Sequence, residues 1–330
     1  MEKRALGKRG PEVSAIGVGA MSFSNMYGPT NEAESHAVLD TALELGVDHI
    51  DTANVYGMGM SENAIGSWLK ARGTNPFTIA TKAGITRDAD GNRCYDNSGR
   101  HLEAELDASL KRMGLEMVDL FYIHRRDHSI PIEDVTETLA AMVRKGKIGA
   151  FGFSEIAPSS LRRAAAVHPV AAVQSEYSLA TRAPELGLVQ ACAELGTALV
   201  AFSPVGRGLL TDTPPDEARV QDSGFLKSNP RFTGRNLREN LEITDRFRKL
   251  AAGMGTSAAA LAIAWLLRQG DHVIPIPGTR SSAHLRELAA GADLALSDPD
   301  IKAIETVLPV GWCHGDRYSD AQWHGPERFS

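Results

Sequence analysis

Eight short apolar runs, rich in β-branched and aromatic residues, alternate along the chain with segments that carry helical signals. Alternating strands and helices form parallel sheets, and right-handed crossovers leave an open doubly wound sheet or a closed barrel as the main solutions. Eight is the strand number of a (β/α)8 TIM barrel, so the sequence predicts an α/β fold of this type. The runs lie near residues 16–20, 48–52, 77–81, 118–123, 150–153, 171–174, 198–202 and 272–276.

The doubly wound alternative, a Rossmann fold, is disfavoured by the glycine pattern. That fold expects the sequence G-x-G-x-x-G directly after its first strand. Gly17-Val18-Gly19 supplies only the first two of these glycines, and Gly57-Met58-Gly59 is followed by Met60-Ser61-Glu62. The closed barrel is therefore the favoured architecture.

The chain shows no obvious linker, which predicts one barrel domain over residues 1–330. Residues 5–7 and 12–15 are expected to form an N-terminal β-hairpin before the first barrel strand. The longest irregular stretch, 204–236, is rich in Gly, Pro and charge, and loops of that length are usually lids or disordered. We expect a lid loop at the catalytic rim, other long rim loops, and a C-terminal tail over 309–330.

Several helices have recognisable ends. Asn31 can cap a helix, with Glu34 reaching back to complete a capping box. A similar signal spans residues 61–73, with glycine at the end. Near the C-terminus, Ser297 precedes Asp298 and Asp300, which favours a helix start because acidic residues interact well with the helix dipole.

Composition excludes several functional classes. The chain has 330 residues, 43% of them hydrophobic, with 35 basic and 41 acidic side chains and a net charge of −6. It offers no broad basic field, so nucleic acid and anionic membranes are not expected partners. The most apolar stretch, 258–267, is too short to span a bilayer.

The three cysteines, Cys94, Cys192 and Cys313, are widely separated and odd in number. Their spacing indicates neither a disulfide framework nor a zinc motif, so no metal site is expected. The N-terminus is charged and is not followed by a long apolar stretch, which argues against a signal peptide. A reduced, cytoplasmic location fits this pattern best.

Four residues whose side chains together could transfer a proton each come at or just after the end of a strand-like run. They are Asp51, Tyr56, Lys82 and His124. In a barrel the C-terminal ends of all strands face one rim, where catalytic residues from different strands converge. Taken singly, each has an ordinary structural explanation, as a solvated charge, a turn cap or a packed ring. Their recurrence at successive strand ends predicts one assembled site.

These residue types suit proton transfer to a carbonyl oxygen. A tyrosine phenol titrates near 10, and a neighbouring ammonium such as Lys82 is expected to lower that pKa while Asp51 holds the ammonium in place. Tyr56 would then act as general acid, and His124 would orient and polarise the carbonyl. The set suits hydride addition to a carbonyl and lacks a nucleophile–base pair for acyl transfer.

Three segments resemble the catalytic motifs of the aldo-keto reductase superfamily, in its bacterial branch with long lid loops. They are Asp51-Thr52-Ala53-Asn54-Val55-Tyr56-Gly57, Ala80-Thr81-Lys82 and Tyr122-Ile123-His124-Arg125, and the resemblance runs from Leu6-Gly7 to the segment 276–280 and the helix beyond. It implies a (β/α)8 barrel that binds NADPH and reversibly reduces an aldehyde or ketone. It also assigns the four residues the roles given above.

The resemblance further implies where the cofactor binds. Ser154 and Gln174 would hydrogen-bond the nicotinamide carboxamide, and Phe202, before Ser203, would stack on the ring. The segment Gly206-Arg207-Gly208 would hold the pyrophosphate, and Gly278-Thr279-Arg280 the 2′-phosphate. Phe202 could instead pack in the barrel core, and Arg207 could be solvated.

The chain departs from the family pattern at the cofactor site. Glu155 stands where many members have Asn, and His284 and Leu288 stand where many have Arg and Asn. The loss of an Arg at the adenosine end weakens the preference for a 2′-phosphate. We therefore expect NADPH, with NADH as the alternative cofactor.

The substrate is expected to be a small-molecule carbonyl compound in an apolar pocket. Candidate lining residues are Met21, Phe23 and Tyr27, the segment 87–95, and the tail with Trp312, Trp323 and His324. The tail aromatics could equally cover the barrel or an oligomer interface. The sequence does not specify the natural substrate, the direction of reaction, the product stereochemistry or the oligomeric state.

Two rival functions remain. The same superfamily includes potassium-channel β subunits, so the chain could be a regulatory subunit that binds nicotinamide cofactor; rapid turnover of aldehydes without a partner would argue against this. A barrel aldolase or hydrolase using Lys82 as a Schiff base is the second rival. It would require a lysine that borohydride traps with substrate, and the pairing of Asp51 with Tyr56 disfavours it.

Overall fold

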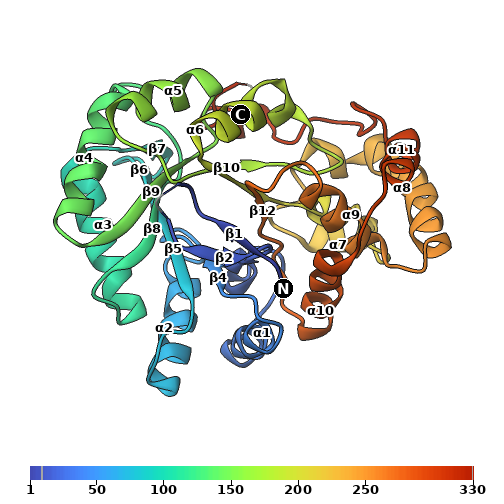
Figure 1. Ribbon diagram of the computed structural model, residues 1–330, viewed down its shortest axis with the longest axis horizontal. Helices are drawn as coiled ribbons and strands as arrows, with labels where there is room; N and C mark the ends of the chain where they lie inside the picture. Colours follow the sequence, from blue (N-terminus) through green and yellow to red (C-terminus); the bar gives the residue numbers. More distant parts are fainter. Residues whose placement is uncertain (9, 329) are drawn as a thin grey trace.

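The described strands curl into a closed barrel in this computed structural model, which describes residues 1–8, 10–328 and 330 (Figure 1). In that part of the chain, eight strands pair in parallel in one sheet. The backbone N–H groups of Gly17 and Gly19 donate to the carbonyls of Pro275 and Pro277, both at 2.9 Å, and join the first edge to the last. The predicted (β/α)8 barrel is confirmed. Its strands are β3 (Val18–Gly19), β4 (His49–Asp51), β5 (Thr78–Ala83), β8 (Val118–Ile123), β9 (Ile148–Ser154), β10 (Ala172–Glu176), β11 (Ala198–Phe202) and β12 (Val273–Pro275).

Helices surround the strands (Figure 1). At the first, Asn31 Oδ1 accepts from the N–H of Glu34 at 2.9 Å, but the Glu34 carboxylate accepts from Thr30 Oγ1 at 3.1 Å, so the expected capping box forms only in part. The box at Ser297 and Asp300 is complete. The helices are α1 (Glu32–Glu44), α2 (Met60–Arg72), α3 (Gly99–Met113), α4 (Ile132–Arg144), α5 (Pro158–Val167), α6 (Leu188–Leu195), α7 (Glu217–Asp222), α8 (Gly234–Gly253), α9 (Ala258–Leu267), α10 (Ser282–Ala290) and α11 (Asp298–Val307).

The strands separate two apolar layers. In β8, Leu120 and Tyr122 face the barrel interior, whereas Phe121 and Ile123 pack outward against the helices. Strand side chains alternate between the two faces, so each strand contributes to both layers. This double burial explains why the strands were visible as almost continuous apolar runs.

The predicted N-terminal hairpin is present as β1 (Lys3–Ala5) and β2 (Glu12–Ser14), paired antiparallel. Leu6 and Val13 pack with the interior side chains of the barrel. Gly7 has φ +78°, and a Cβ there would lie 2.5 Å from the carbonyl oxygen of Ala171, so only glycine fits this close approach. The hairpin therefore closes the barrel end opposite the carboxyl ends of the strands.

The rim carries three additions to the barrel. A short hairpin of β6 (Ile85–Arg87) and β7 (Arg93–Tyr95) follows β5. The segment 204–236 is less irregular than expected, because it contains η3 (Gly206–Gly208), α7 and η4 (Pro230–Phe232). After α11 the tail runs back across the barrel, through η6 (Asp320–Gln322), and ends against Glu155 (Figure 1).

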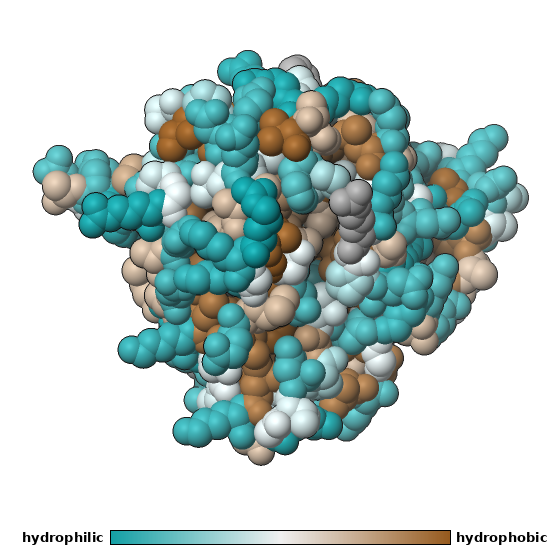
Figure 2. Space-filling model, turned by 60° about the vertical axis from the view of Figure 1, so that its left-hand side comes forward, coloured by the Kyte–Doolittle hydropathy of each residue, from teal (hydrophilic) through white to brown (hydrophobic). Residues whose placement is uncertain are grey.

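Hydrophilic side chains cover most of the face in Figure 2, and apolar side chains show between them in smaller groups. This is the pattern expected of helices that bury one apolar stripe against a sheet. Among the described residues, no single helix is long and apolar enough to cross a membrane. Helices α8 and α9 reach that length and composition only together, and the chain bends by 86° between them.

Candidate active site

Adjacent parallel strands bring the four predicted catalytic residues to one rim. Asp51 is the last residue of β4, Lys82 lies in β5, and His124 directly follows β8. The strand pairing continues past the ends of the strands, since the N–H of Asn54 donates to the carbonyl of Lys82 at 3.3 Å and that of His124 to Ala83 at 2.8 Å. Tyr56 lies in the turn that follows β4.

Lys82 and Asp51 form a buried ion pair. The side chain of Lys82 is fully buried, and its Nζ donates to Asp51 Oδ1 and, at 2.7 Å, to the carbonyl of Thr52. The second oxygen of Asp51 accepts from Gln174 Nε2 at 2.7 Å. Hydrogen bonds to both carboxylate oxygens fix the pair in place, since a buried charge is tolerated only when it is compensated.

Tyr56 and His124 meet above this ion pair. Their rings pack edge to face, with centroids 5.7 Å apart and planes at 86°, and Lys82 Nζ lies 5.1 Å from the centroid of the Tyr56 ring. His124 is buried, and its Nδ1 has no hydrogen-bond partner among the described residues. The two side chains that could contact a carbonyl oxygen therefore lie side by side.

Burial dominates the ionisation of the site. It raises the pKa of the Tyr56 phenol, and the Asp51 carboxylate raises it further. Burial also lowers the pKa of Lys82, against the attraction of Asp51, and lowers the pKa of His124 well below 6.5, assisted by Arg125 and Lys82. The expected lowering of the tyrosine pKa is therefore wrong for this structure, because burial and Asp51 outweigh the opposing effect of Arg125. At neutral pH the phenol keeps its proton and the imidazole is neutral.

A cavity of about 1340 Å³ opens over these residues. Tyr56, His124 and Asp51 line it, whereas Lys82 lies beneath them. The volume exceeds that of an ordinary ligand pocket and can accommodate a large cofactor together with a small substrate.

Most of the expected cofactor residues line the same cavity. Ser154 ends β9, Gln174 lies in β10, and half-buried Phe202 ends β11 with an aromatic face available for stacking. Across the rim, α10 begins with Ser281 as its cap, and helix N-termini favour phosphate. These features fit a nicotinamide dinucleotide. The expected cofactor residues that line the cavity are Ser154, Gln174, Phe202, Ser203, Arg207, Gly208, Gly278, Thr279 and Arg280.

Arg207 is placed differently from the expectation of a solvated or phosphate-binding side chain. Its guanidinium is buried, and it donates to Glu176 Oε2 at 2.5 Å and to the carbonyl of Arg317 at 2.6 Å. Gly206 is buried beside it and is absent from the described cavity lining. The side chain of Arg207 thus connects the segment 204–236 to the barrel and the tail.

Two of the three substrate residues expected after the first strand reach the cavity, and so do Arg87 and Arg93 of the segment 87–95. The tail residues Trp312, Trp323 and His324 are not part of its described lining. Met21 and Tyr27 line it, and burial raises the pKa of Tyr27 to about 12. Phe23 was wrongly placed there, since its side chain is 1% exposed and packs in the core. It lies in η1 (Ala20–Ser24), where a tight helical turn directs neighbouring side chains to different sides.

Sequence reasoning missed the contacts made by the tail. Glu155 is fully buried and pairs with Arg317 at 2.7 Å, and Ser330 Oγ bridges both side chains. Tyr318 and Gln322 line the cavity. No local pattern marks a partner 162 residues away, although the departure at Glu155 was a signal that this position had changed its role.

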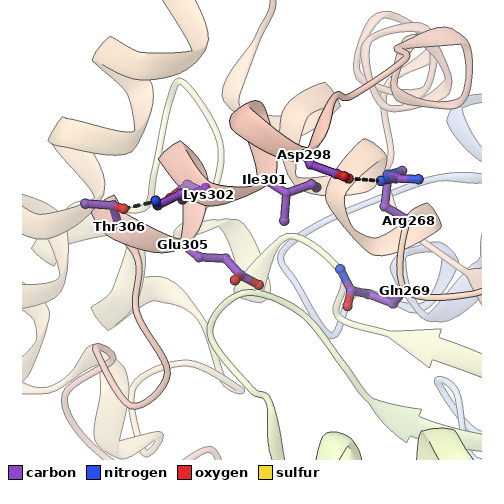
Figure 3. Close-up of a pocket in the computed structure, with 7 residues that line it drawn as sticks. All are labelled: Arg268, Gln269, Asp298, Ile301, Lys302, Glu305 and Thr306. Carbon is purple, nitrogen blue, oxygen red and sulfur yellow. Dashed lines mark hydrogen bonds and ion pairs between the residues drawn. The ribbon is translucent and has the colours of Figure 1, made fainter.

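A second hollow, of about 460 Å³, lies between the end of α9 and α11 (Figure 3). Arg268 donates to Asp298 at 2.8 Å there, and Thr306 Oγ1 donates to the carbonyl of Lys302 at 2.7 Å. Gln269 and Glu305 also border it. None of the candidate catalytic or cofactor residues contributes to its described lining, so the candidate active site lies in the larger cavity.

Comparison with known proteins gives consistent matches over nearly the whole chain. The model of the aldo/keto reductase family matches residues 15–309. The chain is 38% identical to aldo-keto reductase yakc of Schizosaccharomyces pombe, whose name includes NADP(+), over 93% of this chain and 92% of the relative. It is 37% identical to probable aldo-keto reductase 1 of Glycine max, over 98% and 93%.

Solved structures share the fold. The glycerol dehydrogenase AKR11B4 from Gluconobacter oxydans matches with a TM-score of 0.80 and 28% identity, over 93% of this chain and 94% of that one. The aldo-keto reductase AKR11C1 from Bacillus halodurans, in its holo form, matches with 0.78 and 24% identity, over 98% and 99%, and at that identity supports the fold alone. The chain therefore belongs to the aldo/keto reductase family of oxidoreductases.

Proposed function

We propose that the protein reversibly reduces an aldehyde or ketone to an alcohol with NADPH, and that Tyr56 supplies the proton. The observation that carries this proposal is the convergence of Tyr56, His124, Lys82 and Asp51 at a cavity that Ser154, Gln174 and Phe202 also line. Proton donor, orienting group and candidate nicotinamide contacts thus share one space. A nicotinamide cofactor bound there would supply hydride from C4 to the carbonyl carbon.

Residues of the protein would transfer the proton to the carbonyl oxygen and orient that oxygen. The Tyr56 hydroxyl donates it to the carbonyl oxygen as negative charge develops there, and the raised pKa of the phenol keeps that proton available at neutral pH. Neutral His124 donates a hydrogen bond to the same oxygen and orients it. The buried ammonium of Lys82, held by Asp51, stabilises the phenolate that remains.

The choice of NADPH rests on Arg280 and the N-terminus of α10. Arg280 lines the cavity with Gly278 and Thr279, and a guanidinium is well suited to bind a phosphate by two hydrogen bonds. The NADP(+) in the name of the S. pombe relative supports the same choice.

We also propose that the chain acts as one domain and that residues 204–236 form a lid over the cofactor. Several residues of this segment border the cavity. They include Val205, Thr211, Thr213, Pro215, Arg219, Ser223, Phe225 and Leu226.

The test is the initial rate of NADPH oxidation by the purified protein with a panel of aldehydes and ketones, repeated with NADH. Turnover with NADPH is the expected result. Tight NADPH binding without turnover of any carbonyl would overturn the proposal in favour of a cofactor-sensing regulatory subunit. Trapping of Lys82 by borohydride with substrate would favour Schiff-base chemistry instead.

A further inference from the structure

Arg125, which follows His124 on the rim, is a buried cation without a carboxylate partner. Its side chain lines the cavity, and the residue is 8% exposed. Nη1 donates to the carbonyl of His124 at 2.6 Å and to Ser154 Oγ at 3.0 Å, and Nη2 donates to the Tyr318 hydroxyl at 3.2 Å. All of these acceptors are neutral, and no ion pair of Arg125 occurs among the described residues. A buried guanidinium in such a place favours a bound anion.

The surrounding buried charges do not supply that anion. Among the described residues of this region, Arg207 and Arg231 share one carboxylate, that of Glu176, at 2.5 and 3.0 Å. The nearby Glu155 pairs with Arg317, and Arg125 also lowers the pKa of that carboxyl but forms no ion pair with it. Both glutamates are therefore already compensated, and the region keeps an excess of positive charge beside the reacting tyrosine.

Two more arginines lie at the mouth of the cavity. Arg87 and Arg93 stand directly opposite each other in the β6–β7 hairpin, and both line the cavity. Like charges in this position repel, and neither has an ion pair in the described part of the chain. Arg93 also contributes to the lowered pKa of His124, which places its charge within electrostatic reach of the catalytic site.

The cofactor is a poor explanation for these charges. Arg125 contacts Ser154, a candidate partner of the nicotinamide, and a nicotinamide ring is neutral when reduced and positive when oxidised. Phosphate groups would instead meet Arg280 and the start of α10, where Arg280 donates to the carbonyl of Pro29 on the loop after β3. Arg125, Arg87 and Arg93 are therefore better explained as binding a negatively charged group of the substrate.

We propose that the substrate is an aldehyde or ketone that also carries an anionic group, a carboxylate or a phosphate, bound by Arg125. This inference rests on the proposed function. Arg87 and Arg93 attract the anion at the mouth, and Arg125 holds it next to His124 while Tyr56 protonates the carbonyl oxygen. Met21, Val55, Met58 and Ile85 offer apolar contacts for the rest of the molecule.

The first test compares the wild-type protein on matched substrates with saturating NADPH. The 2-, 3- and 4-carboxybenzaldehydes carry the anion at different distances from the carbonyl, and their methyl esters are neutral controls. We expect kcat/KM for at least one acid to exceed that of its ester by about tenfold or more. Added salt should reduce this advantage, because the arginines at the mouth are exposed. A further substrate, 4-formylphenyl phosphate, distinguishes phosphate from carboxylate.

The second test uses variants. Arg125→Gln should lower the ratio of acid to ester kcat/KM by about tenfold, and Arg87→Gln with Arg93→Gln should lower it chiefly at low salt. Arg100→Gln, an exposed arginine outside the described cavity lining, is the matched control. The hairpin variants keep the test valid if Arg125→Gln does not fold. Esters reduced as fast as every acid, or a ratio unchanged in all folded variants, would overturn the inference, while turnover of the esters would still support the reductase.

Discussion

At the scale of single residues, Tyr56 and His124 are both held in their uncharged forms. Burial raises the pKa of the phenol and lowers that of the imidazole. Their charged neighbours are the ion pair between Lys82, which lies beneath them, and Asp51, which borders the cavity, and the guanidinium of Arg125. In the proposed reaction, Tyr56 and His124 would contact the carbonyl oxygen, and the neighbouring charges would set the electric field around it.

Replacing Tyr56 by Phe should abolish most of the turnover. The phenyl ring keeps the edge-to-face contact with His124 but has no proton to donate. We expect kcat to fall by about 100-fold or more, the usual contribution of a general acid, with the NADPH dissociation constant unchanged. Stopped-flow rates and cofactor fluorescence titration measure the two quantities. A variant with wild-type turnover would remove Tyr56 from the proposed role.

His124 should make the fold sensitive to mild acid. Its pKa in the folded protein lies well below the 6.5 of an exposed imidazole, so between these values the unfolded chain binds more protons. The stabilising contribution is complete above pH 6.5 and is lost as pH falls toward the folded pKa, at up to about 1.4 kcal/mol per pH unit. Denaturant unfolding at pH 7.5, 6.5 and 5.5 tests this.

The matched variant for that measurement is His124→Gln. Its free energy of unfolding should fall less steeply between pH 6.5 and 5.5 than that of the wild type. Buried His49, whose pKa burial also lowers, should keep part of the slope in both proteins. Equal slopes in wild type and variant would show that His124 does not titrate in this window.

At the scale of secondary-structure elements, the strands were predictable and their additions were not. Most barrel strands are apolar and buried, so the predicted range matched β8 (Val118–Ile123) at both ends and β4 (His49–Asp51) within one residue at each end. Since Asp51, Lys82 and His124 come near the ends of successive strands, the sequence also predicted that they meet at one rim of the barrel. The prediction that Phe23 lines the pocket was wrong, because the sequence does not show whether an apolar residue after a strand points into a pocket or into the core. The 3-10 turn η1 orients Phe23 into the core.

The loops after the first and last barrel strands meet at the rim, where Arg280 contacts Pro29. Arg280, which follows β12, lies against Gly28, where a Cβ would come within 3.1 Å of its Nη1. Arg280→Ala should weaken NADPH binding by about tenfold and leave NADH binding nearly unchanged, because only NADPH carries the 2′-phosphate.

Fluorescence titration of both cofactors measures that difference. Arg286→Ala, on α10 but paired with Glu44 at the surface, is the control. Equal losses for NADPH and NADH would mean that the 2′-phosphate is bound elsewhere.

The tail is held by a buried ion pair that can be broken from one side. Arg317→Gln leaves the fully buried Glu155 without its cation, and removal of one partner of such a pair costs about 3–5 kcal/mol. We expect a large drop in the melting temperature or early proteolysis of the tail. Arg163→Gln breaks an equally well-formed but exposed pair with Glu133 and should change stability far less. Similar effects of the two changes would contradict a structural role for the tail.

At the scale of the whole molecule, buried side chains fill the barrel interior and the N-terminal hairpin closes one end. The candidate active site lies at the other end. The periodic pattern of the sequence revealed the barrel, because burial on both sides of a sheet leaves long apolar runs. The tail's docking and the excess of positive charge beside His124 were not predictable. They depend on residues such as Arg317 and Glu155, which are far apart in the chain and come into contact only in the folded barrel.

The barrel interior is packed too closely to accept a single added methyl group. Gly152 in β9 lies between Tyr122 and the backbone of Ala172, and a Cβ there would come within 2.6 Å of the tyrosine ring. Gly152→Ala should therefore lower the free energy of unfolding by about 1–3 kcal/mol, because neither a strand backbone nor a buried ring can move away freely. Gly253→Ala, at the end of α8 with open space around it, should be neutral or slightly stabilising. Denaturant unfolding of both variants compares them, and a harmless Gly152→Ala would mean that neighbouring strands can separate, contrary to an interior that packs as one unit.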